Sequence, residues 1–270
     1  MKKVILITGG SSGMGKSAAH ILHQQGHIVY GAARRTERMQ DLKDKGMGIV
    51  SLDLTKEESI VEAVKTVLDK EGRIDVLINN AGYGSYGSVE EISIEEAKRQ
   101  FEVNIFGLAR ITQEVLPGMR AQKSGRIVNI SSMGGKVYTP FGAWYHATKH
   151  ALEGWSDCLR LELKEFNIDV VVVEPGGIDT EWGGIAMEHL EKTSGSGPYA
   201  NFAKKVIGTM GQSGDKLTHV DVLGKEIAKA STVKKPKTRY VKGYMAKPAI
   251  FMRKWFGDKA FDKMIFSQIN

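Results

Sequence analysis

The stretch TGGSSGMGKSA (residues 8–18) follows a short apolar run and fits three glycine patterns of phosphate-binding loops at once. Residues 10–17 read as the GxxxxGKS of a nucleotide-hydrolase P-loop, and residues 13–18 as the GxGxxA dinucleotide fingerprint. Residues 8–15 fit a third, related TGxxxGxG pattern. All three bring glycine backbone close to a phosphate at a helix N-terminus. The loop therefore predicts a phosphate-bearing ligand, either ATP or a nicotinamide cofactor.

Around this loop, short apolar runs alternate with helical patterns. The alternation predicts an α/β fold, a doubly wound parallel seven-stranded sheet of the Rossmann type with ligands at the carboxyl ends of its strands. Two of the intervening helices begin with expected capping boxes, at residues 55–58 and 93–96. The expected strands are Val4–Thr8, Ile28–Ala32, Gly48–Leu52, Ile74–Asn79, Arg126–Ile130, Val170–Glu174 and Tyr240–Lys242.

Length and composition predict one globular domain that resides in the cytoplasm. The 270 residues are 41% hydrophobic and 26% charged, within the ordinary range for a folded domain. The single cysteine, Cys158, excludes an intramolecular disulfide and a cysteine-ligated zinc, and we expect it to be buried among leucines. No metal site is predicted. The apolar run near the start ends after four residues, and a secretory segment needs roughly seven.

The net charge of +7 is concentrated near the end of the chain. Residues 234–263 hold ten Lys and Arg against two Asp, a local charge of +8, which leaves −1 for the rest. This distribution argues against a nucleic-acid surface over the whole protein. We therefore divide the chain into a dinucleotide-binding catalytic domain, residues 1–246, and a basic amphipathic C-terminal extension, residues 247–270.

The end of the second expected strand favours NADP over ATP or NAD. An acid there would bind the ribose hydroxyl of NAD, whereas Arg accepts the 2′-phosphate of NADP. Here Ala33 is followed by Arg34 and Arg35, two guanidiniums suited to a phosphate. The P-loop alternative needs a magnesium-binding acid at a strand end. Only Glu174 stands where such a magnesium-binding acid would be expected, and it is followed immediately by Pro175 and Gly176.

Four further motifs follow the loop in order, and together they identify a family. They are NNAG (residues 79–82), the serine pair 131–132, YHATK (residues 145–149) and PG (residues 175–176). The chain resembles the short-chain dehydrogenase/reductase family over roughly residues 3–180, and more narrowly its hydroxysteroid and retinol dehydrogenase-like branch. The resemblance implies hydride transfer between NADP(H) and a carbonyl/alcohol pair, and a homodimer or homotetramer.

The chemistry of the YxxxK pair is also readable from the residues. Tyr145 and Lys149 are four apart, so they share one helix face. A free phenol has a pKa near 10, and a nearby ammonium is expected to lower it toward the range of an acid–base catalyst. Tyr145 would then be the acid for reduction and the base for oxidation. His146 and His150 face other directions and are expected to be structural.

The resemblance assigns the remaining site residues. Ser132, thirteen residues before Tyr145, occupies the position of the catalytic serine, which holds the substrate oxygen. Asn104 has the fourth catalytic role, positioning a water in a proton relay to Lys149, which also binds the nicotinamide ribose. Asp53 is assigned to the adenine, Asn80 and Gly82 to the adenosine side, and Ile178 and Thr180 to the carboxamide. The full cofactor set is Gly9, Ser11, Ser12, Gly13, Met14, Gly15, Arg34, Arg35, Asp53, Leu54, Asn80, Ala81, Gly82, Tyr145, Lys149, Pro175, Gly176, Ile178 and Thr180.

Residues 181–217 combine apolar side chains with glycine- and serine-rich breaks, which predicts a flexible lid over the site. The alternative is a surface excursion whose apolar residues simply pack down. The residues expected around the substrate are mostly aromatic or apolar, so we expect a medium-to-large apolar substrate such as a steroid, a retinoid or another lipid-like carbonyl. They are Tyr83, Tyr86, Met133, Val137, Tyr138, Phe141 and Trp144.

Two questions stay open at this level. The extension is apolar at helical spacing with cations between, so it could lie on an anionic membrane, which we do not favour, across the substrate entrance, or on a partner subunit. The protein could also be a non-catalytic NADP(H)-binding regulator on the same fold, although such a regulator has no use for a complete proton path.

Overall fold

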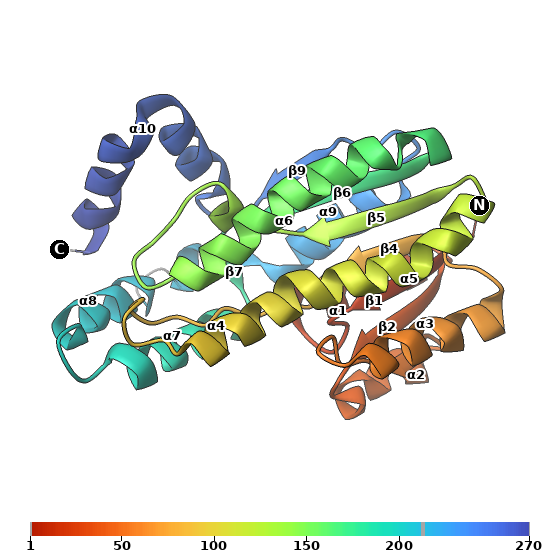
Figure 1. The fold of residues 1–270 in the computed structure, drawn as a ribbon, viewed down its shortest axis with the longest axis horizontal. Coiled ribbons are helices and arrows are strands. Elements are labelled where there is room, and N and C mark those ends of the chain that lie inside the picture. Colours follow the sequence, from red (N-terminus) through yellow and green to blue (C-terminus); the bar gives the residue numbers. More distant parts are fainter. Residues whose placement is uncertain (1, 212–213, 270) are drawn as a thin grey trace.

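The computed structural model describes residues 2–211 and 214–269 and places one parallel sheet at the centre of the chain (Figure 1). The strand order is β3-β2-β1-β4-β5-β6-β9, and each neighbouring pair is parallel. All seven predicted strands are confirmed, with ends that differ by two residues at most. They are β1 (Val4–Thr8), β2 (Ile28–Ala33), β3 (Gly48–Ser51), β4 (Val76–Asn79), β5 (Gly125–Ile130), β6 (Ile168–Pro175) and β9 (Arg239–Lys242).

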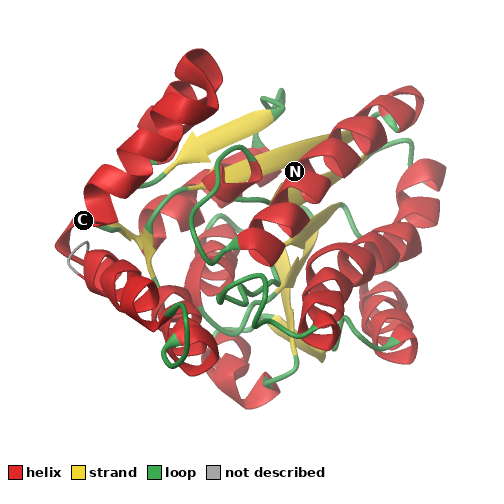
Figure 2. Cartoon of the chain, turned by 60° about the vertical axis from the view of Figure 1, so that its left-hand side comes forward, coloured by secondary structure: helices red, strands yellow, loops and turns green. Residues whose placement is uncertain are grey.

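Helices cover both faces of this sheet (Figure 2). On one face lie α1 (Gly13–Gln24), α2 (Gln40–Asp44) and α9 (Val220–Thr232), and on the other α3 (Glu57–Glu71), α5 (Leu108–Ala121) and α6 (Ala143–Glu162). In β1, Val4 and Leu6 belong to one buried cluster while Ile5 and Ile7 belong to the other. Because both faces are buried, the strands read as continuous apolar runs.

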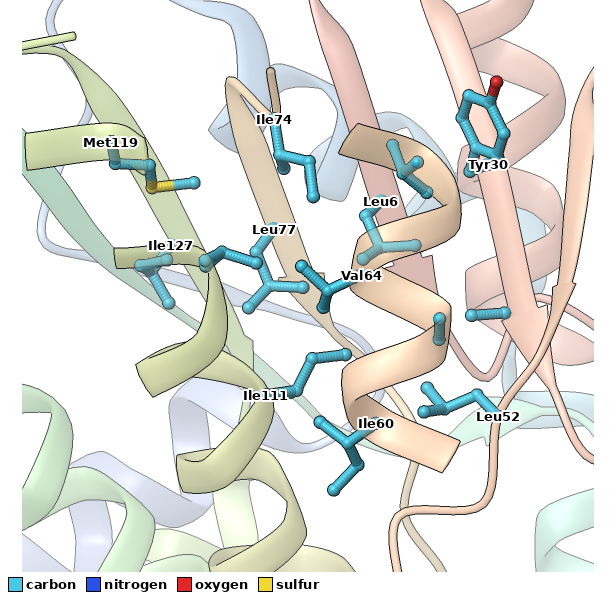
Figure 3. Close-up of a cluster of buried hydrophobic side chains, with 14 of the residues drawn as sticks. Leu6, Tyr30, Leu52, Ile60, Val64, Ile74, Leu77, Ile111, Met119 and Ile127 are labelled. Carbon is cyan, nitrogen blue, oxygen red and sulfur yellow. The ribbon is translucent and has the colours of Figure 1, made fainter. Parts of the chain in front are cut away.

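The core under α3 and α5 illustrates this packing. Figure 3 shows Ile60 and Val64 of α3 beside Ile111 of α5, over Leu6 and Leu77 of the sheet. Each of these side chains is at most 1% exposed. Burying a side chain of this size contributes about 1.5–3 kcal/mol, so the core fixes the strand ends that carry the site.

The strand order reverses next to β1, since β2 and β3 lie on one side of it and β4 on the other. In open α/β sheets, ligands bind outside the carboxyl ends of the strands at such a reversal. The glycine stretch of residues 8–18 follows β1 at this point, and β4 leads into the NNAG motif.

Of the two predicted capping boxes, one forms its N-cap hydrogen bond, while the Glu96 carboxylate accepts from the Tyr83 hydroxyl. Ser93 precedes α4 (Ile94–Phe101), and its hydroxyl accepts a hydrogen bond from the Glu96 N–H at 3.2 Å. The box at Thr55 is wrong, because α3 begins only at Glu57 and the Thr55 hydroxyl donates to Asp53 at 2.8 Å. The Asp53 carboxylate is a strong acceptor two residues away, and it captures the hydroxyl before the helix starts.

The predicted lid folds as two helices, α7 (Glu181–Ser194) and α8 (Ala200–Gly211), where the glycines had predicted irregular chain. Gly183 and Gly184 lie inside α7, whose Ala186 and Leu190 are buried against the body of the protein. Packing of an amphipathic face outweighs the low helix propensity of glycine. Residues 212–213 of this segment lie outside the described residues. Movement of the lid stays a prediction.

The C-terminal extension forms α10 (Ala246–Ile269), which bends at Gly257, where φ is 74°. Figure 1 shows its two arms at the upper left, with the bend pointing away from the sheet. None of the helices in residues 2–211 and 214–269 combines the length and the apolar character needed to cross a membrane.

Cys158 is exposed, so the expectation of a buried thiol is wrong. It lies on α6, which turns Leu152, Ser156 and Leu159 toward the core and leaves Cys158 and Leu161 outside. The leucines near Cys158 in the sequence therefore lie on both faces of the helix, and the sequence alone did not show which face carries the cysteine.

Candidate active site

The glycine loop is held against the end of β4 by the side chain of Asn80. Asn80 donates its side-chain amide to the carbonyl oxygens of Thr8 and Gly9 at 3.0 and 3.2 Å. A Cβ atom at Gly15 would lie 2.4 Å from the Asn80 Nδ2 atom and 2.5 Å from the Gly9 oxygen, so only glycine fits there. Gly9 and Gly13 have φ of 70° and 54°, the left-handed region that favours glycine. The sequence therefore builds an open loop at the N-terminus of α1.

The two residues that distinguish a P-loop are engaged elsewhere. The Lys16 ammonium forms an ion pair with Asp41 at 2.7 Å, and the Ser17 hydroxyl donates to Asp221 of α9 at 2.6 Å. A hydrolase would need the Lys at the phosphates and the Ser on magnesium. Among the described residues, no three His, Cys, Asp or Glu side chains are grouped as a metal site would require. Residues 10–17 therefore match the P-loop sequence pattern, but their side chains do not make the contacts of a P-loop.

Arg34 and Arg35 follow β2 with exposed guanidiniums that make no hydrogen bond or ion pair in the described part of the chain. Asp53 lies close to Arg34 and accepts hydrogen bonds from the Thr55 N–H and hydroxyl. Burial raises the pKa of Asp53, but these hydrogen bonds and the charges of Arg34 and Lys56 outweigh it and hold that pKa below its ordinary value. The end of β2 thus offers two unpaired cations beside one ionised carboxylate.

Tyr145 and Lys149 lie on the buried face of α6, and Ser132 follows β5, so three residues from two elements meet at one point. The Lys149 ammonium is 5.9 Å from the Tyr145 ring centre and donates to the carbonyl oxygen of Ile130 at 2.8 Å. The Ser132 hydroxyl accepts from the Gly134 N–H at 3.0 Å and lies near enough to the Tyr145 hydroxyl to lower its pKa slightly.

The protonation of this pair differs from the sequence-based expectation. Burial raises the pKa of Tyr145 to about 12, against a smaller opposing effect of the Ser132 hydroxyl. Burial also lowers the pKa of Lys149 to about 8, against the charge of Glu153. The expected lowering of the phenol pKa by the ammonium is wrong for the chain by itself, because loss of water disfavours both charged forms.

Asn104 lies in a π-helical turn between α4 and α5, a feature that is common at functional sites. Its amide accepts from the Tyr83 N–H at 3.1 Å and donates to the Tyr83 carbonyl oxygen and the Thr148 hydroxyl at 2.9 and 3.1 Å. A Cβ atom at Gly82 would lie 3.1 Å from the Asn104 Oδ1 atom and 3.8 Å from the Lys149 ammonium. The fold therefore brings Asn104, Gly82 and Lys149 together.

The strand ends opposite the glycine loop carry the other predicted cofactor residues. A Cβ atom at Gly13 would meet the Thr180 methyl group at 3.6 Å, so residues 178–180 face the loop across the site. Gly176 allows the close approach of the Tyr244 carbonyl oxygen, which would lie 2.2 Å from a Cβ atom there. The loop, Gly82 and Thr180 form a cradle of backbone with little side-chain bulk, which fits an extended dinucleotide.

The aromatic residues predicted to surround the substrate separate into three groups. Tyr86 and Phe141 are buried with Tyr145 and the lid helices, whereas Met133, Val137 and Tyr138 contact α10. Trp144 packs edge-on against Phe101, and the Tyr83 hydroxyl donates to Glu96, so these two point toward α4 instead.

One direct neighbour of Tyr145 comes from the predicted lid, although the sequence did not place it among the residues around the substrate. Trp182, at the start of α7, has its ring 5.0 Å from that of Tyr145 and 6.0 Å from that of Tyr86. Its apolar character and its place just after the PG motif were the only signals in the sequence. The lid is anchored on the other side by an ion pair of 3.1 Å between Arg38 and Glu181.

His146 is structural, as expected, and it shapes the loop around Ser132. Its Nε2 atom accepts from the Thr139 N–H at 3.0 Å, which leaves Nδ1 to donate to the Gly134 carbonyl oxygen at 3.0 Å. Burial lowers its pKa to about 4, so the ring is neutral at pH 7.

A buried ionic cluster behind Lys149 was also missed. Glu153 pairs with Lys136 and Arg239 at 2.8 and 3.0 Å, and Arg239 reaches Glu174 at 3.3 Å. Burial and the charge of Glu153 raise the pKa of Glu174 to about 7. These residues come from α6, β6, β9 and the loop after β5, so no local pattern connected them. Glu174 thus serves an ion-pair network and not a magnesium ion.

A Rossmann-type sheet with a glycine loop at its switch point and a buried Tyr-x-x-x-Lys pair is the architecture of a nicotinamide-dependent oxidoreductase. The sequence model of the family described as short chain dehydrogenase matches residues 3–189. The chain belongs to the short-chain dehydrogenase family.

Individual relatives agree with this assignment. The chain is 42% identical over 179 residues to a 3-ketodihydrosphingosine reductase of Bacteroides thetaiotaomicron, a match that spans 66% of this chain and 65%, under two thirds, of that protein. It is 31% identical to an NADPH-dependent 3-dehydrocapnine reductase of Ornithobacterium rhinotracheale over 98% of this chain and 96% of that protein. The crystal structure of a short-chain dehydrogenase from Streptomyces avermitilis has a TM-score of 0.81 and 34% identity, covering 94% of this chain and 92% of that one.

Proposed function

We propose that the protein is an NADP(H)-dependent oxidoreductase that interconverts a carbonyl and an alcohol on a medium-to-large apolar substrate. The observation that carries the proposal is the burial of Tyr145 among aromatic and apolar side chains, with Lys149 and Ser132 beside it. These polar residues are suited to proton transfer, and their apolar surroundings are suited to an apolar substrate.

In the proposed proton path, side chains of this protein act one after another. Ser132 holds the substrate oxygen, and the Tyr145 hydroxyl gives a proton to that oxygen in reduction or takes it in oxidation. Lys149 binds the nicotinamide ribose, and Asn104 positions a water that returns protons toward Lys149. NADPH, when bound, supplies the hydride, so the two-electron reduction of the carbonyl is balanced by one hydride and one proton.

Arg34 and Arg35 support the preference for NADP. Both guanidiniums are exposed and unpaired among the described residues, and the strand end before them carries Ala33 where an NAD-binding protein would have an acid. A guanidinium binds a phosphate in a bidentate way, whereas it gains little from a ribose hydroxyl. The similarity to a reductase named as NADPH-dependent is in line with this proposal.

The cover over Tyr145 supports the substrate class. Tyr86 and Trp182 pack against the Tyr145 ring, Phe141 and Phe202 belong to the same apolar cluster, and none of the four carries a charge that would bind an acidic or sugar-like substrate. The similarity to a reductase named for 3-ketodihydrosphingosine agrees with a lipid-like carbonyl. We also propose that the protein is cytoplasmic and forms a homo-oligomer, as is usual for members of the family.

The test is an NADPH-oxidation screen over classes of carbonyl compound, with NADH as the control. We expect turnover of apolar ketones or aldehydes with NADPH, and turnover confined to small sugars or charged acids would contradict the substrate class. Tyr145→Phe should lower kcat by at least ~100-fold and leave NADPH binding unchanged. A wild-type chain that binds NADPH but reduces no carbonyl class would favour a non-catalytic NADP(H)-binding regulator.

A further inference from the structure

The outer face of α10 carries three aromatic side chains that the rest of the chain leaves exposed. Phe251, Trp255 and Phe256 are 56, 67 and 60% exposed, and we refer to them as the aromatic cluster. The ring of Phe251 lies 6.3 Å from that of Trp255 and 6.1 Å from that of Phe256. Isolated apolar residues are common on surfaces, but a contiguous aromatic cluster indicates a contact with another apolar body.

The aromatic cluster is exposed although α10 itself is packed against the rest of the protein. The opposite face of α10 is packed, since Ala249 and Phe261 are 5 and 1% exposed and lie against Val137 and its neighbours. The Tyr138 hydroxyl also donates to Asp262 at 2.8 Å. The bend at Gly257 follows the aromatic cluster directly and points away from the sheet (Figure 1). The inner face therefore covers the loop after Ser132, and the outer face stays available.

Uncompensated cations accompany the aromatic cluster. α10 has five cations against two carboxylates, a net charge of +3, and Arg253 pairs with Asp258. The Lys254 ammonium lies 5.4 Å from the Trp255 ring centre. The remaining exposed lysines have no ion-pair partner among residues 2–211 and 214–269; they are Lys247, Lys259 and Lys263.

The sequence alone did not favour a membrane contact for this extension, but the exposed aromatic cluster changes that view, and we propose that the bend of α10 docks on an anionic lipid surface. The aromatic cluster enters the boundary between headgroups and acyl chains, and the lysines stay at the level of the phosphates, as in amphipathic helices that lie in a membrane interface. A second copy of the chain fits this face less well, because a symmetric contact would bring the same set of cations against itself. Docking on lipid uses both the aromatic and the cationic character of the face.

The position of α10 connects this surface to the candidate active site. Its inner face contacts Met133 and Tyr138, which follow Ser132 by one and six residues, while its outer face is directed to the lipid. The docking itself rests on α10 alone, so it does not depend on the proposed reaction, and its test needs no substrate.

Vesicle co-sedimentation of the full chain tests the proposal. Vesicles of phosphatidylcholine are compared with vesicles of phosphatidylcholine and phosphatidylserine, and each is assayed at low and high salt. We expect binding to the anionic vesicles that weakens with salt, and a loss of about tenfold or more in Phe251→Ser/Trp255→Ser/Phe256→Ser. Lys254→Glu/Lys259→Glu should remove the preference for phosphatidylserine.

The matched control replaces three exposed apolar residues elsewhere, Val89→Ser/Ile94→Ser/Leu161→Ser, whose side chains are 63, 53 and 65% exposed. This control should bind vesicles as the wild type does. Thermal unfolding and NADPH binding verify that each variant is folded. The tryptophan fluorescence of the wild type should shift to the blue with anionic vesicles, and the variant that lacks Trp255 should not show this shift.

Two results would overturn the proposal. The first is equal sedimentation of the wild type and the aromatic triple variant with anionic vesicles, including no sedimentation of either. The second is a triple variant that becomes smaller in sedimentation velocity without any change in vesicle binding, which would make this face an interface between copies of the chain.

Discussion

Trp182 of the lid packs against Tyr145, with ring centroids 5.0 Å apart and ring planes at 51°. The residue that would transfer the proton is therefore covered by the helix predicted to move. Any apolar substrate that reaches the phenol must displace this tryptophan or lie alongside it, so the contact links substrate binding to the position of α7.

Replacing Trp182 should change substrate affinity more than the chemical step. A substrate that lies alongside Trp182 would gain an apolar contact of ~0.5–1.5 kcal/mol from that ring, so Trp182→Ala should raise KM for an apolar ketone by ~3–10-fold with a smaller change in kcat. Steady-state kinetics over a range of ketone concentrations measure both parameters. Trp155→Phe, on the far side of the core, is the matched control. An unchanged KM in Trp182→Ala would contradict a role of the lid in substrate binding.

Arg34 should decide the choice of cofactor. Losing a charged hydrogen-bond partner costs about 1.5–3 kcal/mol, so Arg34→Glu should lower kcat/KM for NADPH by at least ~10-fold. The value for NADH should change little, because no 2′-phosphate is involved. Arg120→Glu, at the end of α5 far from the glycine loop, controls for the change in net charge. Parallel losses with both cofactors would assign Arg34 a structural role.

His146 should make the protein less stable in mild acid. Its pKa in the folded chain is about 4, below the ordinary 6.5, so the unfolded chain binds the additional proton. The neutral ring therefore stabilises the fold above pH 6.5, and this contribution of roughly 3 kcal/mol is lost as the pH falls toward 4. Urea unfolding at pH 7.5, 5.5 and 4.5 measures the free energy of unfolding. His146→Gln should be less stable at pH 7.5 and should show a shallower decline, and an equal decline in both proteins would contradict the assignment.

Gly15 should tolerate no side chain. A Cβ atom there would lie 2.5 Å from the Gly9 carbonyl oxygen, which is backbone and cannot move aside without disturbing the loop. Gly15→Ala should lower the free energy of unfolding by ~1–3 kcal/mol and weaken NADPH binding. The matched control is Gly154→Ala on α6, where nothing lies within 4 Å. That variant should gain ~0.5–1 kcal/mol from better helix propensity, and similar losses in both variants would disprove the steric argument.

Patterns that are local in the chain determined much of this protein. Strands buried on both faces have continuous apolar runs, so seven of them could be located to within two residues, and parallel pairing followed from the helices between them. The glycine spacing, the Arg34-Arg35 pair and the Tyr145-x-x-x-Lys149 spacing are likewise local, because each depends on a turn, a strand end or one helix face.

Only the tertiary structure decided the features that depend on burial and on distant segments. It placed Trp182 on Tyr145, engaged Lys16 and Ser17 away from the phosphate loop, and turned Cys158 outward. It also raised the pKa of Tyr145 where its neighbour in sequence suggested a decrease, because the loss of hydration around the buried phenol outweighs the opposing effect of the Ser132 hydroxyl. Sequence patterns fix which side chains share a local element, whereas desolvation and contacts between elements exist only once the chain has folded.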